Sequence, residues 1–311
     1  MRAIFFGTPH FAAQVLRFLQ EGTIPLLAIV TQPDRPQGRR RKVEYTSVKK
    51  AALAIYPDVP ILQPEKATDP HFHQEIALFS PDFFFVVGYG KILQRSLLDL
   101  TPFPINIHAS LLPEYRGAAP MQRALMDGKK VTGITIMKMN EKMDEGEVLA
   151  QEKIAIGPEM TLGELEEALS QMGGKLLLKT LASPMCPQAQ DSNRATYAPK
   201  LEPSEFQIDW SRDAWAIHNQ IRALSPKPGA WFYLGREKKR CKILQSLPTQ
   251  SCSGPGVPGE VLERKNRWIV ATQKGSLEIL RVQLEGKAPL DARSFLCGFS
   301  LPRFLYTKNR D

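Results

Sequence analysis

The first half of the chain alternates short apolar runs of strand length with segments in which apolar residues recur at helical spacing. Strand-like runs occupy residues 3–6, 26–31, 83–87 and 105–108, and helical patterns occupy residues 11–19, 47–55 and 72–78 between them. Alternating strands and helices predict a mainly parallel sheet with helices on both faces. We therefore expect a Rossmann-like α/β domain, in which ligands bind beyond the carboxyl ends of the strands.

The second half of the chain has a different pattern. A helical stripe over residues 161–181 is followed by a polar, proline-containing stretch at 183–194 and a helical pattern at 215–224. Short strand-like runs separated by Gly and Pro then lie at residues 231–234, 242–247, 259–262, 268–271 and 277–282. These runs predict a small β-barrel, similar to an OB-fold. We expect a first domain over residues 1–182, a linker over 183–207 and a C-terminal barrel domain over 208–311.

Several common kinds of site find no support in the sequence. The four cysteines are scattered without a C-x-x-C pair, and His71 and His73 read as surface residues, so we expect no metal or redox site. The turn Gly7-Thr8-Pro9 lacks the paired glycines of a dinucleotide-binding motif. The N-terminus does not resemble a signal peptide, and no apolar run is long enough to cross a bilayer. We therefore expect a cytoplasmic protein that does not enter a membrane.

One amide, one imidazole and one carboxylate stand out near the predicted strand ends. Asn106 and His108 are separated by one residue at the end of a strand, so their side chains point to the same side. Both can donate to the negative oxygen that develops during acyl transfer, and Asp144 can assist proton transfer directly or through a water. Taken singly, each residue could instead cap a turn or shape a loop. Taken together, the three suit acyl transfer to an amine.

Positive charge is distributed unevenly along the chain. Residues 1–190 contain 21 Lys and Arg against 20 Asp and Glu, whereas residues 191–311 contain 20 against 12, so the net excess is +1 in the first part and +8 in the second. The first part still groups five cations in one predicted loop: Arg35, Arg39, Arg40, Arg41 and Lys42. Such a distribution is typical of binding to a large polyanion, although a solvated surface turn is the alternative for the loop.

Segments across nearly the whole chain resemble the formyltransferases that use 10-formyltetrahydrofolate. In the first domain the resemblance rests on residues 6–9, 31–36, 86–90, 106–120 and 132–146. In the second it rests on residues 208–211, 218–224, 228–231, 286–290 and 295–299. Two positions depart from the family pattern, because Glu145 stands where many relatives carry Thr or Ser and Ala109 stands where Gly is common. Neither departure removes a catalytic group.

The resemblance implies roles for the residues of the first domain. By similarity, Asn106, His108 and Asp144 match the catalytic residues of the family, and 10-formyltetrahydrofolate is the co-substrate. The segment Ser110-Leu111-Leu112-Pro113 matches the tetrahydrofolate-binding segment. The turn Val86-Val87-Gly88-Tyr89-Gly90 would supply backbone hydrogen bonds to the pterin.

The basic residues favour one kind of acceptor within this family. A small nucleotide acceptor does not require several cations near the active-site mouth, whereas Arg side chains can bridge the phosphates of a tRNA acceptor stem and stack on its bases. We therefore expect a monomeric enzyme that formylates the α-amino group of methionine on initiator methionyl-tRNA, with the C-terminal domain binding the rest of the RNA. The alternatives are transfer to a small amine, such as a nucleotide sugar or a glycinamide nucleotide, and a non-catalytic RNA-binding protein.

Overall fold

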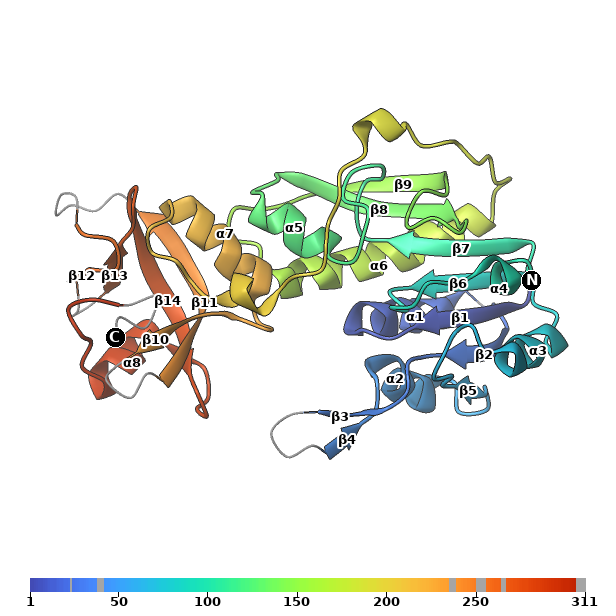
Figure 1. Ribbon diagram of the computed structural model, residues 1–311, viewed down its shortest axis with the longest axis horizontal. Coiled ribbons are helices and arrows are strands. Elements are labelled where there is room, and N and C mark those ends of the chain that lie inside the picture. Colours follow the sequence, from blue (N-terminus) through green and yellow to red (C-terminus); the bar gives the residue numbers. More distant parts are fainter. Residues whose placement is uncertain (23, 38–41, 235–238, 250–255, 264–266, 306–311) are drawn as a thin grey trace. The chain divides into compact units, whose positions relative to one another are not determined.

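Figure 1 shows the computed structural model, which describes residues 1–22, 24–37, 42–234, 239–249, 256–263 and 267–305. The chain divides into two compact units, each assembled from several segments. Unit 1 comprises Met1–Pro120, Val131–Ala155 and Glu166–Pro199, and unit 2 comprises Met121–Lys130, Ile156–Leu165 and Lys200–Asp311. Each unit has a hydrophobic core of its own.

Unit 1 is organised around a seven-stranded sheet. Its strands lie in the order β5 (Ile61–Leu62), β2 (Leu26–Val30), β1 (Ala3–Gly7), β6 (Phe83–Val87), β7 (Phe103–His108), β8 (Val131–Lys138) and β9 (Glu147–Ala155). Neighbouring strands from β5 to β7 are parallel, whereas β8 runs antiparallel to β7 and β9 antiparallel to β8. The mainly parallel α/β sheet predicted from the sequence is confirmed, with β8 and β9 as an antiparallel edge.

The central strands of this sheet have no polar face. Every residue of β1 and β6 is buried, and the Phe6 ring packs edge to face against Phe84 and Tyr89. Strands covered on both faces must be apolar throughout. This explains why the sequence shows continuous apolar runs at these positions rather than strict alternation.

The helices of unit 1 are α1 (His10–Glu21), α2 (Ser47–Ile55), α3 (Pro70–Leu78), α4 (Arg95–Leu98) and most of α6 (Leu162–Leu181). Side chains cap the starts of α2 and α3, because Thr46 accepts a hydrogen bond from the Lys49 N–H and Asp69 accepts one from the His71 N–H. None of the helices in the described part of the chain is long and apolar enough to span a membrane.

Two adjacent glycines let α6 approach the strand that carries the candidate site. A Cβ atom on Gly173 would lie 3.1 Å from Ile107 on β7, and one on Gly174 would lie 2.5 Å from Phe18 on α1. The second distance is shorter than real Cβ contacts allow. Glycine at these positions therefore lets α6 pack closely against both β7 and α1.

Unit 2 contains a curled antiparallel sheet of six strands (Figure 1). β10 (Ala230–Leu234), β11 (Lys239–Thr249), β14 (Ser276–Leu284), β13 (Trp268–Ala271) and β12 (Val261–Glu263) lie in this order, and β15 (Leu290–Asp291) pairs with β14. Helices α7 (Ala214–Leu224) and α8 (Ala292–Gly298) belong to the same unit, as does nearly all of α5 (Pro120–Met126). Its core includes the contacting rings of Trp210, Phe232, Trp268 and Phe295. The β-rich second part predicted from the sequence is confirmed.

The buried Arg222 of α7 connects three segments of unit 2. Its Nη1 donates to the carbonyl oxygens of Gly157 and Met160, both at 3.3 Å, and its Nη2 donates to that of Leu125 at 3.4 Å. Burial lowers the pKa of the guanidinium, and the carbonyl groups replace hydrogen bonds to water. Compact unit 2 therefore includes residues from within the span 1–182. The linear limits expected above, with a linker over 183–207, stay a prediction.

Candidate active site

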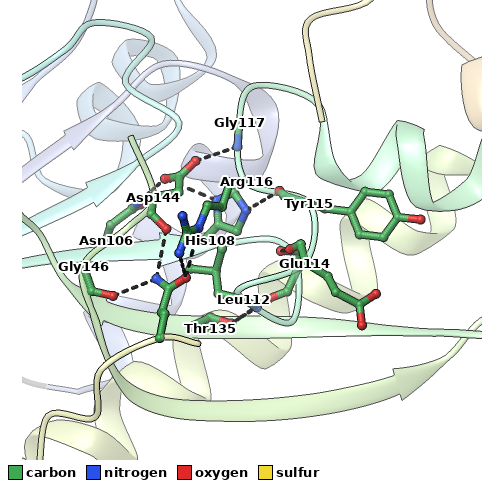
Figure 2. A network of polar contacts seen from close by, with 12 residues as sticks. Asn106, His108, Leu112, Glu114, Tyr115, Arg116, Gly117, Thr135, Asp144 and Gly146 are labelled. Carbon is green, nitrogen blue, oxygen red and sulfur yellow. Dashed lines mark hydrogen bonds and ion pairs between the residues drawn. The ribbon is translucent and has the colours of Figure 1, made fainter. Parts of the chain in front are cut away.

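The amide, imidazole and carboxylate identified in the sequence meet within unit 1 (Figure 2). Asn106 and His108 lie on β7, and Asp144 lies on the loop between β8 and β9. Asn106 Nδ2 donates a hydrogen bond to Asp144 Oδ1 at 3.3 Å, and His108 Nδ1 lies 3.6 Å from the same oxygen. One carboxylate oxygen therefore contacts both β7 side chains.

This cluster is largely shielded from water. The side chains of His108 and Asp144 are only 7% and 12% exposed. Solvent screening is weaker in such a setting than in bulk water, so charges and dipoles interact more strongly. The arrangement is suited to stabilising charge that develops during a reaction.

The His108 ring is held at both nitrogens. Its Nε2 lies 3.0 Å from the carbonyl oxygen of Tyr115. A carbonyl oxygen accepts but never donates, so Nε2 carries a proton in this arrangement and Nδ1 is the nitrogen that faces Asp144. The Tyr115 contact thus fixes which nitrogen points toward the carboxylate.

Asp144 occupies an unusual backbone conformation. Its φ is 55°, in the left-handed region that Asp tolerates better than most non-glycine residues. The N–H of Gly117 donates to Asp144 Oδ2 at 2.8 Å, which leaves Oδ1 toward Asn106 and His108. Each carboxylate oxygen therefore has its own set of partners.

Gln190 is a part of this network that the sequence did not indicate. Its Nε2 donates to the carbonyl oxygens of Asp144 at 2.9 Å and Gly146 at 2.7 Å, while its Oε1 accepts from Arg116 Nε and Nη2 at 3.1 and 2.9 Å. Gln190 lies in the mostly exposed stretch that we expected to be a linker, and no local pattern distinguishes it from neighbouring polar residues. Thr196 of the same stretch accepts from the Tyr115 N–H through its hydroxyl oxygen at 2.8 Å.

Glu145, one of the two departures from the family pattern, has a charged partner. Its Oε1 lies 3.4 Å from Nη1 of Arg116, whose side chain is 3% exposed, and its Oε2 lies 3.6 Å from Lys142 Nζ. A buried guanidinium needs a nearby negative charge or several acceptors to compensate for lost hydration. Glu145 supplies that charge on the loop that also carries Asp144. Ala109, the other departure, is buried beside His108.

The expected folate-binding segment, residues 110–113, is anchored by Thr135 of β8. The Thr135 hydroxyl donates to the Ser110 carbonyl oxygen at 2.7 Å and accepts from the Leu112 N–H at 3.0 Å. The buried Ser110 hydroxyl donates to the Glu114 carbonyl oxygen at 2.6 Å. Leu112 is buried, whereas Leu111 and Pro113 are partly exposed. Within this segment the Leu111 and Pro113 side chains are accessible, whereas the Ser110 hydroxyl is not.

The expected pterin turn, residues 86–90, starts within the last two residues of β6. Gly88 and Gly90 have φ values of 52° and 80°, and a Cβ atom on Gly90 would meet nothing within 4 Å. The carbonyl oxygen of Tyr89 already accepts hydrogen bonds from Thr8 Oγ1 and Gln32 Nε2, both at 3.1 Å. Burial raises the pKa of the Tyr89 hydroxyl to about 12. Val86 and Val87 belong to the sheet, so the open side of this turn lies at Gly90.

The expected basic loop is only partly described. Its arms are β3 (Arg35–Gln37) and β4 (Lys42–Glu44), which pair antiparallel as a separate two-stranded sheet (Figure 1). Arg35 is exposed and its Nη2 donates to Glu65 Oε2 at 2.6 Å. Arg39, Arg40 and Arg41 lie outside the described residues. Of the five expected cations, Arg35 and Lys42 therefore lie on paired strands.

The described residues offer no cluster of three or more His, Cys, Asp or Glu side chains placed to hold a metal ion. Of the two α3 histidines, His73 contacts the carbonyl oxygen of Ala67 through Nε2 at 2.8 Å. His71 is exposed.

Comparison with known proteins identifies the family. Residues 1–181 match the family model described as formyl transferase, and residues 200–300 match the formyl transferase C-terminal domain. The chain belongs to the formyl transferase family, which confirms the resemblance found in the sequence. The methionyl-tRNA formyltransferase of Protochlamydia amoebophila is 40% identical over 319 aligned residues, covering 99% of this chain and 98% of the relative.

Solved structures share the fold at lower sequence identity. HypX from Aquifex aeolicus in complex with tetrahydrofolic acid matches with a TM-score of 0.65 and 17% identity, covering 99% of this chain and 51% of HypX, so this chain spans about half of that protein. The N-formyltransferase from Helicobacter canadensis, in complex with folinic acid and dTDP-3-aminofucose, matches with a TM-score of 0.66 and 16% identity, covering 89% of this chain and 98% of that one. At this identity the likeness establishes the fold alone.

Proposed function

We propose that this protein transfers the formyl group of 10-formyltetrahydrofolate to the α-amino group of methionine on initiator methionyl-tRNA. The product would be N-formylmethionyl-tRNA, which serves translation initiation. One observation carries the proposal: a protein named methionyl-tRNA formyltransferase is 40% identical over almost the full length of both chains. Asn106 and His108 both face Oδ1 of Asp144, and these three side chains supply the chemistry. Action as a cytoplasmic monomer stays a prediction of the sequence.

Asn106 and His108 are proposed to stabilise the negative charge that develops on the formyl oxygen. The Asn106 amide has two N–H groups and gives one to Asp144, so the second can donate to the formyl oxygen. His108 Nδ1 lies on the same side of the cluster, and it becomes a second donor when the ring carries a proton on both nitrogens. Loss of one such donor typically lowers the rate by about 10²- to 10³-fold.

Asp144 is proposed to move the proton of the attacking amine. Its Oδ2 is held by the Gly117 N–H, and its Oδ1 faces the two β7 side chains. A carboxylate fixed in this way can accept the amine proton directly or through a water and pass it toward the leaving nitrogen. Proton transfer of this kind contributes about 10²- to 10⁴-fold to a rate.

The residues present fit a folate co-substrate, which supplies the formyl group when bound. Leu111 and Pro113 are partly exposed beside the His108 strand end, and they would hold the co-substrate through apolar contact. The open space at Gly90 admits a planar ring close to the backbone. The backbone of residues 86–90 would form hydrogen bonds with that ring. Ser110 and Leu112 support this surface from within.

The RNA acceptor is proposed to be held mainly by positive charge. Arg35 and Lys42 lie on the arms of the β3–β4 hairpin, and Arg39, Arg40 and Arg41 lie between them in the sequence. The excess of +8 beyond residue 190 suits a C-terminal domain that contacts the RNA backbone. Such contacts position a nucleic acid without reading its sequence.

The experiment offers labelled 10-formyltetrahydrofolate, with the purified protein, to charged initiator tRNA, uncharged initiator tRNA and small amines such as a nucleotide amino sugar. We expect label only on the methionine of the charged tRNA. Labelling of a small amine while charged tRNA stays unlabelled would establish the small-acceptor alternative. RNA binding without any transfer would establish a non-catalytic RNA-binding protein.

A further inference from the structure

The direction of the Asp144 carboxylate depends on a backbone conformation that must be held in place. A φ of 55° is unfavourable for a residue with a side chain, so the surrounding contacts have to select it. If the loop relaxed, the carboxylate would leave the position at which Asn106 and His108 both face it. The contacts that select this conformation are therefore part of how the site is built.

Gln190 makes those contacts with the loop backbone. Its Nε2 group has two N–H donors, and both are used on the loop: one on the carbonyl oxygen of Asp144 and one on that of Gly146. The direction of the Asp144 carbonyl defines the ψ angle of that residue. Gln190 therefore fixes the main chain on either side of Glu145 and, through it, the direction in which the Asp144 side chain leaves the loop.

Arg116 determines which end of the Gln190 amide faces the loop. Two guanidinium N–H groups donate to Gln190 Oε1, so the Nε2 group must point toward the carbonyl oxygens. Arg116 is buried and lies near the Glu145 carboxylate, which keeps the guanidinium in place. Its neighbours Tyr115 and Gly117 contact His108 and Asp144 directly. One three-residue segment thus sets the orientation of the ring, the carboxylate and the Gln190 amide.

We propose that Gln190 is a positioning residue for formyl transfer, acting through the main chain of Asp144. This inference rests on the proposed function, and it assigns a role in catalysis to a stretch that otherwise reads as an exposed connection. Gln190 contacts the loop carbonyls and Arg116 rather than the reacting atoms. It is therefore expected to affect the rate of the chemical step more than the binding of either substrate.

The test replaces the two donors without changing the size of the side chain. Gln190→Glu keeps an acceptor for Arg116 but places a carboxylate oxygen against two carbonyl oxygens. We expect kcat to fall about 10- to 100-fold while both KM values stay within about threefold of the wild type, as for a misplaced catalytic group. Gln188→Glu is the matched control, because it makes the same charge change two residues away on an exposed side chain. The control should keep wild-type kinetics.

A double-mutant cycle separates positioning from a general structural effect. If Gln190 acts through Asp144, adding Gln190→Glu to Asp144→Asn should lower kcat no further than Asp144→Asn alone. Multiplied losses in the double variant would show that Gln190 acts elsewhere and would overturn the proposal. Gln190→Met, an uncharged side chain of similar length without donors, replaces Gln190→Glu in the cycle if the latter does not fold.

A measurement without turnover keeps this inference distinct from the proposed function. Hydrogen exchange of the backbone amides of residues 141–147 should be faster in Gln190→Glu than in Gln188→Glu, because the loop loses two anchors. Equal exchange in the two variants would overturn the positioning role, whatever the activity. The wild-type protein could transfer no formyl group while the two variants still differ in exchange. That result would overturn the proposed function and retain Gln190 as the residue that holds the loop.

Discussion

His108 Nδ1 faces Asp144 Oδ1 across 3.6 Å while the opposite ring nitrogen is held by the Tyr115 carbonyl oxygen at 3.0 Å. The ring cannot turn away from the carboxylate without breaking that second contact. Imidazole and carboxylate are therefore oriented before a substrate arrives, which is the condition under which fixed groups stabilise a transition state without reorganising.

Asp144→Asn tests the proposed proton acceptor. The substitution keeps the size of the side chain but removes its negative charge and its ability to take a proton. We expect kcat for formyl transfer to fall by about 10²- to 10⁴-fold, the usual contribution of a positioned acid or base. Steady-state assays at saturating tRNA and 10-formyltetrahydrofolate would measure the loss. Asp58→Asn, on an exposed residue of the same unit, is the control, and a near-normal rate in Asp144→Asn would exclude the role.

Gly117→Ala tests whether the carboxylate must be held by a backbone donor. Gly117 has a φ of 121°, and a Cβ atom there would lie 2.7 Å from the carbonyl oxygen of Ala198. The resulting shift would displace the N–H that donates to Asp144 Oδ2. We expect kcat to fall about 10- to 100-fold, as for a displacement of about 1 Å in a catalytic group.

The control for that prediction is Gly286→Ala, in which the glycine also has a positive φ, 77°, but a Cβ atom would meet nothing within 4 Å. This variant also places an alanine at a positive φ, but its Cβ atom clashes with no neighbouring atom. Thermal unfolding of both variants separates loss of fold from loss of rate. Equal kinetics in the two variants would show that the Gly117 contact has no part in catalysis.

The sequence predicted the fold where the signal is local. Apolar runs mark β1 and β6 because these strands are buried on both faces, and the run ending at His108 marks the end of β7. The antiparallel arrangement of β8 and β9 was not predicted, because strand direction depends on pairing with a distant partner. The short arms of the β3–β4 hairpin were missed because a strand of three residues is too short to show a periodic signal.

The residues of the candidate site also differ in whether the local sequence indicates them. Asn106 and His108 are two residues apart on one strand, so local geometry alone places them on one side. Asp144 was singled out for its chemistry and by the family resemblance, because nothing in its neighbourhood indicates that the loop folds back over β7. Gln190 contacts a carbonyl group 46 residues earlier in the chain, and this contact exists only in the folded unit. Its stretch is polar, so sequence reasoning interprets it as a connection.

Neutralising the basic hairpin should reduce the salt dependence of RNA binding. Each phosphate contact made by Lys or Arg contributes about 0.7 to 0.9 to the slope of log K against log salt. Changing Arg39, Arg40 and Arg41 to Gln should lower that slope by about 2 to 3 if all three contact phosphates. Binding titrations of initiator tRNA over a range of KCl concentrations would measure it. Changing the exposed Lys66, Lys153 and Lys175 to Gln is the charge-matched control, and equal slopes in the two triple variants would exclude the hairpin.

His218 should make unit 2 less stable in acid. The side chain is 2% exposed, and its pKa is lowered from 6.5 chiefly by burial, with the nearby Arg222 charge acting in the same direction. The unfolded chain therefore binds a proton more readily than the folded protein does. The stabilising contribution is complete above the unfolded pKa of 6.5 and is lost as the pH falls from there toward the lower folded value.

Replacing this histidine removes the titration but can keep a hydrogen bond, because the Gln side chain of His218→Gln can donate to the Pro158 carbonyl oxygen that His218 Nε2 now contacts at 2.9 Å. We expect the decline in the free energy of unfolding between about pH 7 and pH 5 to become shallower, by at most about 1.4 kcal/mol per pH unit, the limit for one proton. Urea titrations at several pH values would measure it. His71→Gln, on an exposed histidine, should leave the decline unchanged, and parallel curves for wild type and His218→Gln would show that another group governs acid stability.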